Sequence, residues 1–289
     1  MRVLITGGEG QLATALRAAV PEGWVVNIAG RRELDVALAS SARAVFEAFE
    51  PQLVINTAAY TAVDKAEEEP DKAFTVNTDG ARIVAELCVE SSARMIQLST
   101  DFVFDGRKSS PYLPGDAPHP LGVYGSSKRE AERLVLETLG ERAAVVRTSW
   151  LYGAGGKNFV MAMLSRMQAG QPLDVVADQI GTPTWTRTLA DALWRIGRRP
   201  DVEGIWHFSD AGVASWYDFT CAIQEEAISA GLVENPVVVK PIRSEDYKSM
   251  ARRPYYSVLD KTRTWGELDI VPVHWRMGLR GMLMELKNG

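Results

Sequence analysis

Short apolar runs alternate with helical patterns through the first half of the chain, and this alternation limits the fold more than any other feature. Each run is rich in valine, isoleucine and leucine. The runs span residues 2–6, 24–29, 53–57, 95–99 and 143–148. Strands this apolar, alternating with helices, are typical of a parallel sheet that is covered on both faces. The pattern therefore predicts an α/β fold built on a doubly wound, Rossmann-type parallel sheet.

The intervening helices have recognisable ends. Their apolar residues recur with helical spacing over residues 11–20, 40–50, 71–91 and 123–139. Pro21 ends the first helix, because proline cannot continue the hydrogen-bonding pattern. Ser40 is the expected N-cap of the second, since a serine hydroxyl can accept from a free N–H group in the first turn.

The alternation becomes looser after Trp150. Helical stretches follow at 159–168, 188–197, 216–230 and 275–286, separated by short strands and by loops with proline and glycine. We expect residues 1–150 to form one domain built on the parallel sheet and residues 151–289 a smaller, mixed α/β region. The boundary is soft, since the chain is free to cross between the two regions more than once.

Composition excludes several other classes of protein. A net charge of −5 supplies no basic surface for nucleic acid. Cys88 and Cys221 are too few for a disulfide framework or a cysteine zinc site, and three scattered histidines show no ligand spacing. No segment approaches the ~18 apolar residues of a membrane span, and the first apolar run ends too early for a signal peptide. We expect a cytoplasmic protein without a metal.

A glycine-rich turn joins the first strand to the first helix. Gly7 and Gly10 stand where a phosphate needs bare backbone N–H groups at a helix N-terminus. Ala13 takes the place of a third glycine, where the helix packs on the strand and a methyl group is tolerated. The turn favours a dinucleotide site, and a glycine turn without a ligand is the alternative.

The end of the second strand indicates which dinucleotide binds. NAD sites place an acid there to hold the ribose diol, whereas the phosphate of NADP favours arginine. Arg31 and Arg32 follow the strand and no acid stands at its tip, so NADPH is expected, with NADH as the other cofactor that fits. Asp35 would then lie near the adenine. A solvated surface pair of arginines is the alternative.

Tyr124 and Lys128 open the long helix before the fifth strand, and their spacing of four places both on one helix face. A free phenol has a pKa near ~10, and we expect the ammonium one turn away to lower the pKa of Tyr124. Thr100, at the carboxyl end of the fourth strand, is expected to donate to a carbonyl oxygen on which charge develops. The combination predicts a hydride-transfer site. Trp150, after the fifth strand, either packs on a sugar or closes the core.

Sequence blocks along nearly the whole chain resemble the extended short-chain dehydrogenase/reductase family, and within it the branch that reduces nucleotide-linked keto sugars. The blocks are 7–12, 56–67, 99–106, 120–128, 147–153, 178–184, 252–254 and 257–260. The resemblance implies reduction of a dTDP-linked 4-keto-6-deoxy sugar, such as dTDP-4-dehydro-L-rhamnose to dTDP-L-rhamnose, for cell-surface polysaccharide. It implies hydride addition at C4 and protonation of O4 by Tyr124, while Thr100 steadies that oxygen and Lys128 orients the ribose.

The resemblance also extends the set of expected site residues. Cofactor contacts are expected at Gly7, Gly10, Gln11, Leu12, Arg31, Asp35, Val36, Ala59, Tyr60, Thr61, Leu98, Tyr124 and Lys128. The sugar is expected at Thr100, Asp101 and Trp150, and the nucleotide diphosphate at Arg253.

The chain departs from the family pattern at Phe102, which replaces a more usual tyrosine, and at Ala15, which replaces a glutamate of an interfacial magnesium site. We therefore carry over no metal, and a homodimer remains open. Three alternatives also remain. The first is a related reductase of a different dTDP-linked sugar, because the stereochemistry depends on a pocket shape that the sequence does not show. The second is a nucleotide-sugar epimerase or dehydratase of the same superfamily. The third is a non-catalytic NADP-binding subunit, because the chain also resembles the regulatory subunit of methionine adenosyltransferase.

Overall fold

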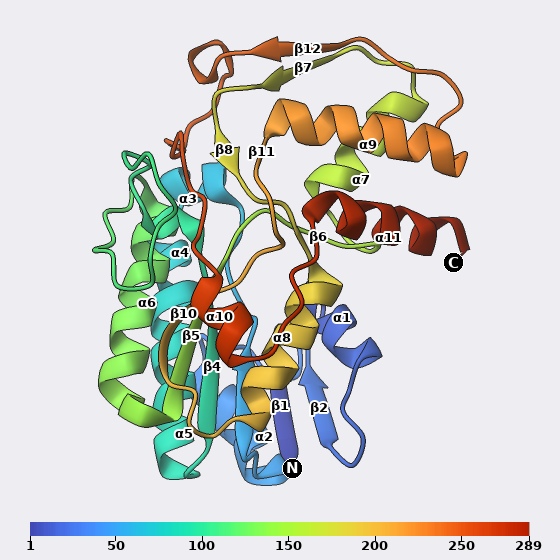
Figure 1. Ribbon diagram of the computed structural model, residues 1–289. Coiled ribbons are helices and arrows are strands. Elements are labelled where there is room, and N and C mark those ends of the chain that lie inside the picture. Colours follow the sequence, from blue (N-terminus) through green and yellow to red (C-terminus); the bar gives the residue numbers. More distant parts are fainter. Residues whose placement is uncertain (289) are drawn as a thin grey trace.

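Six parallel strands form the central sheet of the computed structural model, which describes residues 1–288 (Figure 1). Their spatial order is β10-β5-β4-β3-β1-β2. The strands are β1 (Arg2–Thr6), β2 (Val25–Ala29), β3 (Leu53–Asn56), β4 (Arg94–Thr100), β5 (Ala143–Thr148) and β10 (Gly204–His207). The five strands predicted in the first half are confirmed to within one residue at each end, and so is the parallel, doubly wound class. β10 comes from the second half of the chain.

Helices cover both faces of this sheet because successive strand residues point to opposite sides. On β1, Val3 and Ile5 belong to one apolar cluster and Leu4 to the other. The first cluster lies under α1 (Gln11–Ala18) and α8 (Thr186–Arg198), and the second under α2 (Ala39–Phe49), α5 (Gly80–Glu90) and α6 (Val123–Leu139).

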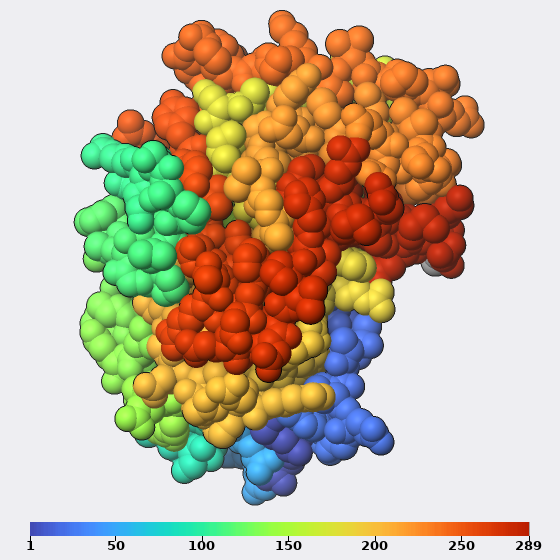
Figure 2. All heavy atoms as spheres, viewed as in Figure 1, coloured from blue at the N-terminus to red at the C-terminus, as the bar shows by residue number. Residues whose placement is uncertain are grey.

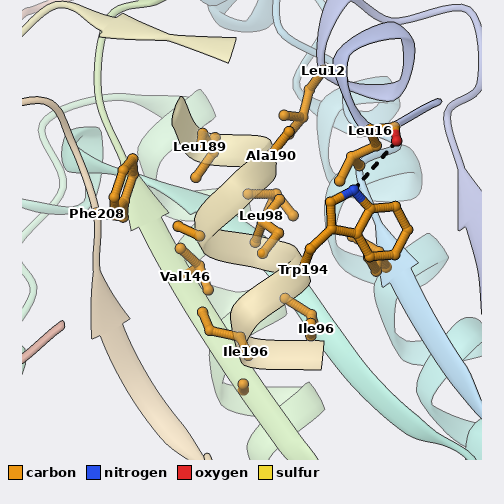
Figure 3. Packing of buried hydrophobic residues seen from close by; sticks show 14 of the residues in the cluster. Leu12, Leu16, Ile96, Leu98, Val146, Leu189, Ala190, Trp194, Ile196 and Phe208 are labelled. Atoms are coloured by element: carbon orange, nitrogen blue, oxygen red, sulfur yellow. Dashed lines mark hydrogen bonds between the residues drawn. The ribbon is translucent and has the colours of Figure 1, made fainter. Parts of the chain in front are cut away.

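Figure 3 shows the first cluster, in which α8 packs against α1 and the sheet. Trp194 of α8 donates from its indole nitrogen to the backbone oxygen of Leu16 at 3.3 Å, so its one polar atom is satisfied within an apolar contact. α8 belongs to the second half of the sequence and yet completes the core of the first.

Two details of the predicted helices are wrong. α2 begins at Ala39 with Leu38 as its N-cap and without a side-chain cap, so Ser40 lies inside the helix rather than at its end. The expected single helix over 71–91 is three consecutive pieces: α4 (Pro70–Phe74), a π-helical turn η1 (Thr75–Asp79) and α5. At this turn Asn77 bonds the backbone of Tyr60 and the hydroxyl of Ser127, and these tertiary contacts are not visible in helical periodicity.

The C-terminal region surrounds a third apolar cluster between α7 (Phe159–Gln168), α9 (Trp216–Ala230) and α11 (Trp275–Asn288). This region also contains three two-stranded sheets. They pair β7 (Leu173–Val176) with β12 (Val239–Ile242), β8 (Ile180–Gly181) with β11 (Ala214–Ser215), and β6 (Leu151–Tyr152) with β9 (Thr184–Trp185). The shorter elements are α3 (Val63–Glu68), η2 (Asp101–Val103), η3 (Gly140–Arg142), η4 (Ser244–Asp246) and α10 (Thr262–Glu267).

The chain crosses between the two regions. β10 joins the central sheet and α8 packs on one of its faces. In Figure 2 the orange-red C-terminal segments lie against the lower part of the molecule, which contains the central sheet. We propose that the chain divides into two domains after residue 150, and that β10 and α8 return from the second domain to the first. Among residues 1–288, no helix combines the length and apolar character needed to cross a bilayer.

Candidate active site

A cavity of about 470 Å³ lies at the carboxyl ends of the central strands, and all the residues expected to contact the cofactor line it. These are Gly7, Gly10, Gln11, Leu12, Arg31, Asp35, Val36, Ala59, Tyr60, Thr61, Leu98, Tyr124 and Lys128. Lys72 and Lys157 line it too, although no pattern in the sequence singled them out. The cavity therefore brings the glycine turn and the tyrosine–lysine pair to one site.

The glycine turn has no room for side chains. Gly7 has φ +73°, and a Cβ added there would lie 2.7 Å from the backbone nitrogen of Ala58. A Cβ on Gly8 would lie 2.9 Å from the carbonyl carbon of Ala29. Gly10 is the N-cap of α1 and supplies no side chain to the first turn, which also lacks an acidic residue. The N–H groups at this helix end thus lie beside the cavity with no acidic side chain in the first turn, which suits the diphosphate of a dinucleotide, although Glu9, just before the N-cap, also lines the cavity.

Arg31 and Asp35 meet at the far end of the cavity in a salt bridge of 3.2 Å. The Arg31 side chain is largely exposed, so the pair is weak and a bound phosphate can replace the carboxylate as its partner. Asp35 also accepts from the backbone nitrogen of Ala37, which holds the turn in place. Arg32, its neighbour in sequence, does not line the cavity.

One polar atom of the cavity lacks a partner. The hydroxyl of Thr148, at the end of β5, is buried and has no hydrogen bond within residues 1–288. A buried hydroxyl without a partner costs about 1–3 kcal/mol, so a ligand that bonds it is stabilised by that amount. The unpaired Thr148 hydroxyl and the glycine turn together show that the residues lining this cavity are suited to bind a dinucleotide. Thr148 was not among the residues expected from the sequence.

Lys128 lies on the inner face of α6, where it is 3% exposed. Its Nζ donates to the backbone oxygen of Leu98 at 2.6 Å. Burial lowers the pKa of Lys128 to about 8, and the carboxylate of Glu132, one helical turn further on, opposes that fall. Glu132 is itself held by two hydrogen bonds from the buried guanidinium of Arg147.

Tyr124 does not have the lowered pKa that its spacing from Lys128 suggested, and that expectation is wrong. Burial raises the pKa of Tyr124 to about 12; the hydrogen bond with Thr100 opposes the rise and the charge of Asp101 adds to it. The reason is that removing water destabilises the phenolate, while the Lys128 ammonium is engaged by Leu98. The phenol is therefore protonated, which is the form that a proton donor needs.

Thr100 and Asp101 stand at the tip of β4, next to Tyr124. The Thr100 hydroxyl donates to Asp101 Oδ1 at 3.1 Å and accepts from the backbone nitrogen of Phe102 at 3.2 Å. Asp101 is 1% exposed, and its Oδ2 accepts from the Ser257 hydroxyl at 2.6 Å. The Phe102 ring meets the Tyr124 ring edge-on, with centroids 5.7 Å apart. Tyr124 thus lies between the cofactor cavity and a polar cluster at β4.

Trp150 packs against a second tryptophan. Its ring is stacked on Trp216 with centroids 3.5 Å apart and planes 6° apart, and its backbone has φ +46°. Gly181 makes room for it, since a Cβ there would lie 2.6 Å from the indole. Trp150 is partly exposed and partly packed on the third apolar cluster, so both of its expected roles remain open.

Arg253 lines a second cavity, of about 390 Å³, in the C-terminal region. Phe159, Trp216 and Tyr247 supply aromatic walls, and Arg166 a second positive charge. The guanidinium of Arg253 is held in place by a salt bridge of 2.8 Å to the carboxylate of Asp64. This cavity combines flat apolar walls with cations, as a nucleotide would require. No pattern in the sequence pointed to Trp216, and Asp64 lies in the block 56–67 without any sign that it pairs with Arg253.

Comparison with known proteins gives one consistent family. The family described as RmlD substrate binding domain matches residues 1–288. A dTDP-4-dehydrorhamnose reductase of Aggregatibacter actinomycetemcomitans is 40% identical over 288 residues, with 97% of this chain and 98% of that protein covered. A protein of Streptomyces antibioticus named as a probable dTDP-4,6-dihydroxy-2-methyloxan-3-one 4-ketoreductase is also 40% identical, with 97% of this chain and 94% of that one covered.

A solved structure agrees with this. The crystal structure of dTDP-4-dehydrorhamnose reductase from Bacillus anthracis, in complex with NADP, matches with a TM-score of 0.92 and 33% identity. The match covers 98% of this chain and 99% of that one, so the likeness extends over both regions of the molecule.

Proposed function

Because the chain belongs to the RmlD substrate binding domain family, we propose that it is an NADPH-dependent reductase of a dTDP-linked 4-keto-6-deoxy sugar, and that it converts dTDP-4-dehydro-L-rhamnose to dTDP-L-rhamnose. The chain is an oxidoreductase of the short-chain dehydrogenase/reductase class that serves nucleotide-sugar biosynthesis. One observation carries the assignment: a single cavity joins the glycine turn to Tyr124, and Tyr124 lies beside Thr100 and Asp101.

The residues of the cofactor cavity divide the work of holding NADPH. The N-terminus of α1 with Gly7 and Gly10 binds the diphosphate, and Arg31 binds the additional phosphate at the adenine end. Lys128 bonds a ribose hydroxyl when it turns from Leu98, and Thr148 gains the partner that it lacks. When bound, NADPH supplies the hydride that is added to C4 of the sugar.

Tyr124 supplies the proton. As the C4 carbonyl gains a C–H bond, its oxygen takes the phenolic hydrogen and the ketone becomes an alcohol. Burial and the Asp101 charge keep the phenol protonated until that step, when the negative charge forming on O4 makes the oxygen a stronger acceptor. Thr100 hydrogen-bonds the same oxygen when its hydroxyl turns from Asp101, and it thereby stabilises the developing charge.

The second cavity suits the nucleotide part of the substrate. Arg253 pairs with the diphosphate, and the ring of Trp216 offers a face on which a base stacks. Trp150, stacked behind Trp216, then borders the sugar. We place the enzyme in the cytoplasm, where the cell keeps its reduced nicotinamide cofactor. Sedimentation of the purified protein distinguishes a monomer from the homodimer left open above.

A coupled reaction tests the proposed function. The protein is incubated with dTDP-glucose, the preceding dehydratase and epimerase, and NADPH, and the loss of NADPH absorbance is followed. We expect one NADPH to be oxidised for each dTDP-L-rhamnose formed, with the product identified by mass and NMR. A cofactor that stays bound and shows no net oxidation would indicate the epimerase alternative. Co-purification with a partner and no turnover of any keto sugar would indicate a regulatory subunit.

A related reductase is the second candidate. The 40% identity to the ketoreductase of Streptomyces antibioticus equals that to the rhamnose-forming enzyme, so both substrates fit the family membership. The two candidate reactions differ in the keto sugar and in the product. Measuring kcat/KM with each keto sugar in the same coupled reaction shows which one the protein prefers.

A further inference from the structure

The segment between β12 and α10 carries a serine to which the proposed function gives no role. In Figure 1 this orange-red segment descends past α3 to α10, along the edge of the sheet where the active site lies. Ser257 lies on it, is 2% exposed, and donates from its backbone nitrogen to Ile180 at 2.8 Å. Leu259 forms a bridge to Tyr112 two residues later. The backbone around Ser257 is therefore fixed on both sides.

The Ser257 side chain is directed at the catalytic cluster. Its hydroxyl donates to Asp101 Oδ2 at 2.6 Å, across 156 positions of sequence. The other carboxylate oxygen accepts from Thr100 at 3.1 Å. Asp101 is buried, so these hydroxyls replace the water that would otherwise solvate its charge. Asp101 thus joins two hydroxyls, of which one belongs to the proposed catalytic set and the other to the C-terminal segment.

We propose that Ser257 is a positioning residue of the active site: its hydroxyl holds the Asp101 carboxylate in the orientation that keeps Thr100 beside Tyr124. The inference rests on the proposed function, because that function gives Asp101, Thr100 and Tyr124 their roles in the reduction. Ser257 acts through Asp101 and does not touch the substrate. Without its hydroxyl, Asp101 loses one of two side-chain donors in a site closed to water, and the carboxyl takes up a proton or turns.

The charges around Asp101 give this contact a chemical consequence. Tyr124 of α6 and the hydroxyl of Thr100 at the tip of β4 lie next to Asp101, and Ser257 faces it from the C-terminal segment, whereas the Lys128 ammonium is bonded to Leu98. Burial raises the pKa of Asp101 to about 6, and the Ser257 hydrogen bond opposes that rise. Loss of the hydroxyl therefore protonates Asp101 nearer neutral pH. The negative charge that helps to keep the Tyr124 phenol protonated is then lost.

Two substitutions of Ser257 test the inference in the full chain. Ser257→Ala removes the donor, whereas Ser257→Cys keeps a side chain of similar size with a weaker donor. Ser209→Ala is the matched control, because Ser209 is also fully buried but its hydroxyl bonds the backbone of Asp210. The titration of Asp101 is followed by NMR of protein labelled at the aspartate carboxyl carbons, and Asp101→Asn identifies the signal. Turnover with NADPH and the keto sugar is measured from pH 5 to about 9.

We expect the titration midpoint of Asp101 to rise in the order wild type, Ser257→Cys, Ser257→Ala, by about one pH unit for the last. The acidic limb of the kcat profile should rise with it, so that kcat falls about twofold at pH 7 and about tenfold near pH 5, with unchanged NADPH affinity. Ser209→Ala should keep the wild-type midpoint and profile. A purely structural role of Ser257 would lower the melting temperature without ordering the midpoints by donor strength.

The two claims fail in different ways. If wild type oxidises NADPH and the Asp101 midpoint is the same in all Ser257 variants, the inference is overturned and the proposed function stands. If the midpoints shift but wild type reduces no keto sugar, the proposed function fails and the catalytic role of Ser257 fails with it. If both the midpoint and the acidic limb move together, the positioning role is supported.

Discussion

The cofactor side and the substrate side of the active site are assembled in different ways. On the proposed cofactor side, the glycine turn follows β1 directly and Arg31 lies just after β2, so short-range order places both at one sheet edge. The start of α6 reaches the same edge after the loop that follows η2. On the substrate side, Asp101 reaches Ser257 across 156 positions and Asp64 reaches Arg253 across 189. One side is a product of local structure, and the other depends on polar contacts between distant segments.

This difference predicts which kinds of substitution impair each side. The cofactor cavity rests on two apolar clusters that include both faces of the sheet, so a change there acts through backbone geometry. The substrate side depends on a few hydrogen bonds that hold a segment in place, so single side chains there control binding without supporting the core. Tyr124 belongs to both sides, and its loss should therefore have the largest effect.

Tyr124→Phe removes the proton donor where the two sides meet. We expect kcat to fall by about 10²–10⁴-fold, since that is the usual contribution of a positioned acid. NADPH affinity should stay within twofold or so of wild type, because the ring and its contact with Phe102 remain. Steady-state kinetics and fluorescence titration with NADPH measure the two quantities. A variant with wild-type kcat would remove Tyr124 from the reaction.

Gly7→Ala tests the local construction of the cofactor side. The added Cβ would meet the Ala58 backbone at 2.7 Å, so the turn must shift, and NADPH affinity should fall about 100-fold as the turn loses one or two hydrogen bonds to the charged diphosphate. Gly231→Ala is the control, since Gly231 also has positive φ, +74°, in the left-handed α conformation, but its Cβ would meet nothing within 4 Å. It should lose about 1 kcal/mol of stability and bind NADPH normally. Equal NADPH affinity in both variants would contradict the account.

Arg253→Gln tests the substrate side alone. Loss of a charged hydrogen bond to a diphosphate should raise KM for the nucleotide sugar by about 10–100-fold. NADPH affinity should not change, because Arg253 lines the second cavity and not the first. Arg252→Gln, at the exposed neighbouring position, serves as the control and should leave KM as it is. If both variants raise KM equally, the general charge of the segment is responsible and not Arg253.

Arg31→Gln should have the smallest effect, because its salt bridge with Asp35 is largely exposed. We expect the preference for NADPH over NADH to narrow by about five- to tenfold, with kcat/KM for NADH unchanged. The ratio of kcat/KM for the two cofactors is the measurement. An unchanged ratio would assign the discrimination to another cation of the cavity, such as Lys72 or Lys157.

The residues predicted for the cofactor side line one cavity in the structure, because the signals that point to them are local. The glycines, the tyrosine–lysine spacing and the threonine at the tip of β4 each follow from one element and its neighbour, and the structure brings them together as expected. The pKa of Tyr124 was predicted in the wrong direction, since helical spacing reports the distance to Lys128 but not the loss of water that dominates the shift. Ser257 and Asp64 lie within the matching blocks 257–260 and 56–67, but their partners, like that of Trp216, could not be found in this way because only the folding of the C-terminal region creates those contacts.

The return of β10 and α8 to the first domain was likewise invisible to local patterns. Trp194 of α8 finds its hydrogen-bond partner on α1, 178 positions away, so no window of sequence contains both members of that contact.

A crystal structure with bound NADP and the dTDP-linked sugar would test the central claim, that Tyr124 joins the two sides and protonates the substrate. The account predicts the diphosphate of NADP at the N-terminus of α1, the nucleotide of the sugar against Arg253, and the Tyr124 hydroxyl within about 2.6–3.2 Å of the sugar O4. It would be contradicted by a complex in which both ligands are bound and the phenol of Tyr124 is beyond the reach of that oxygen.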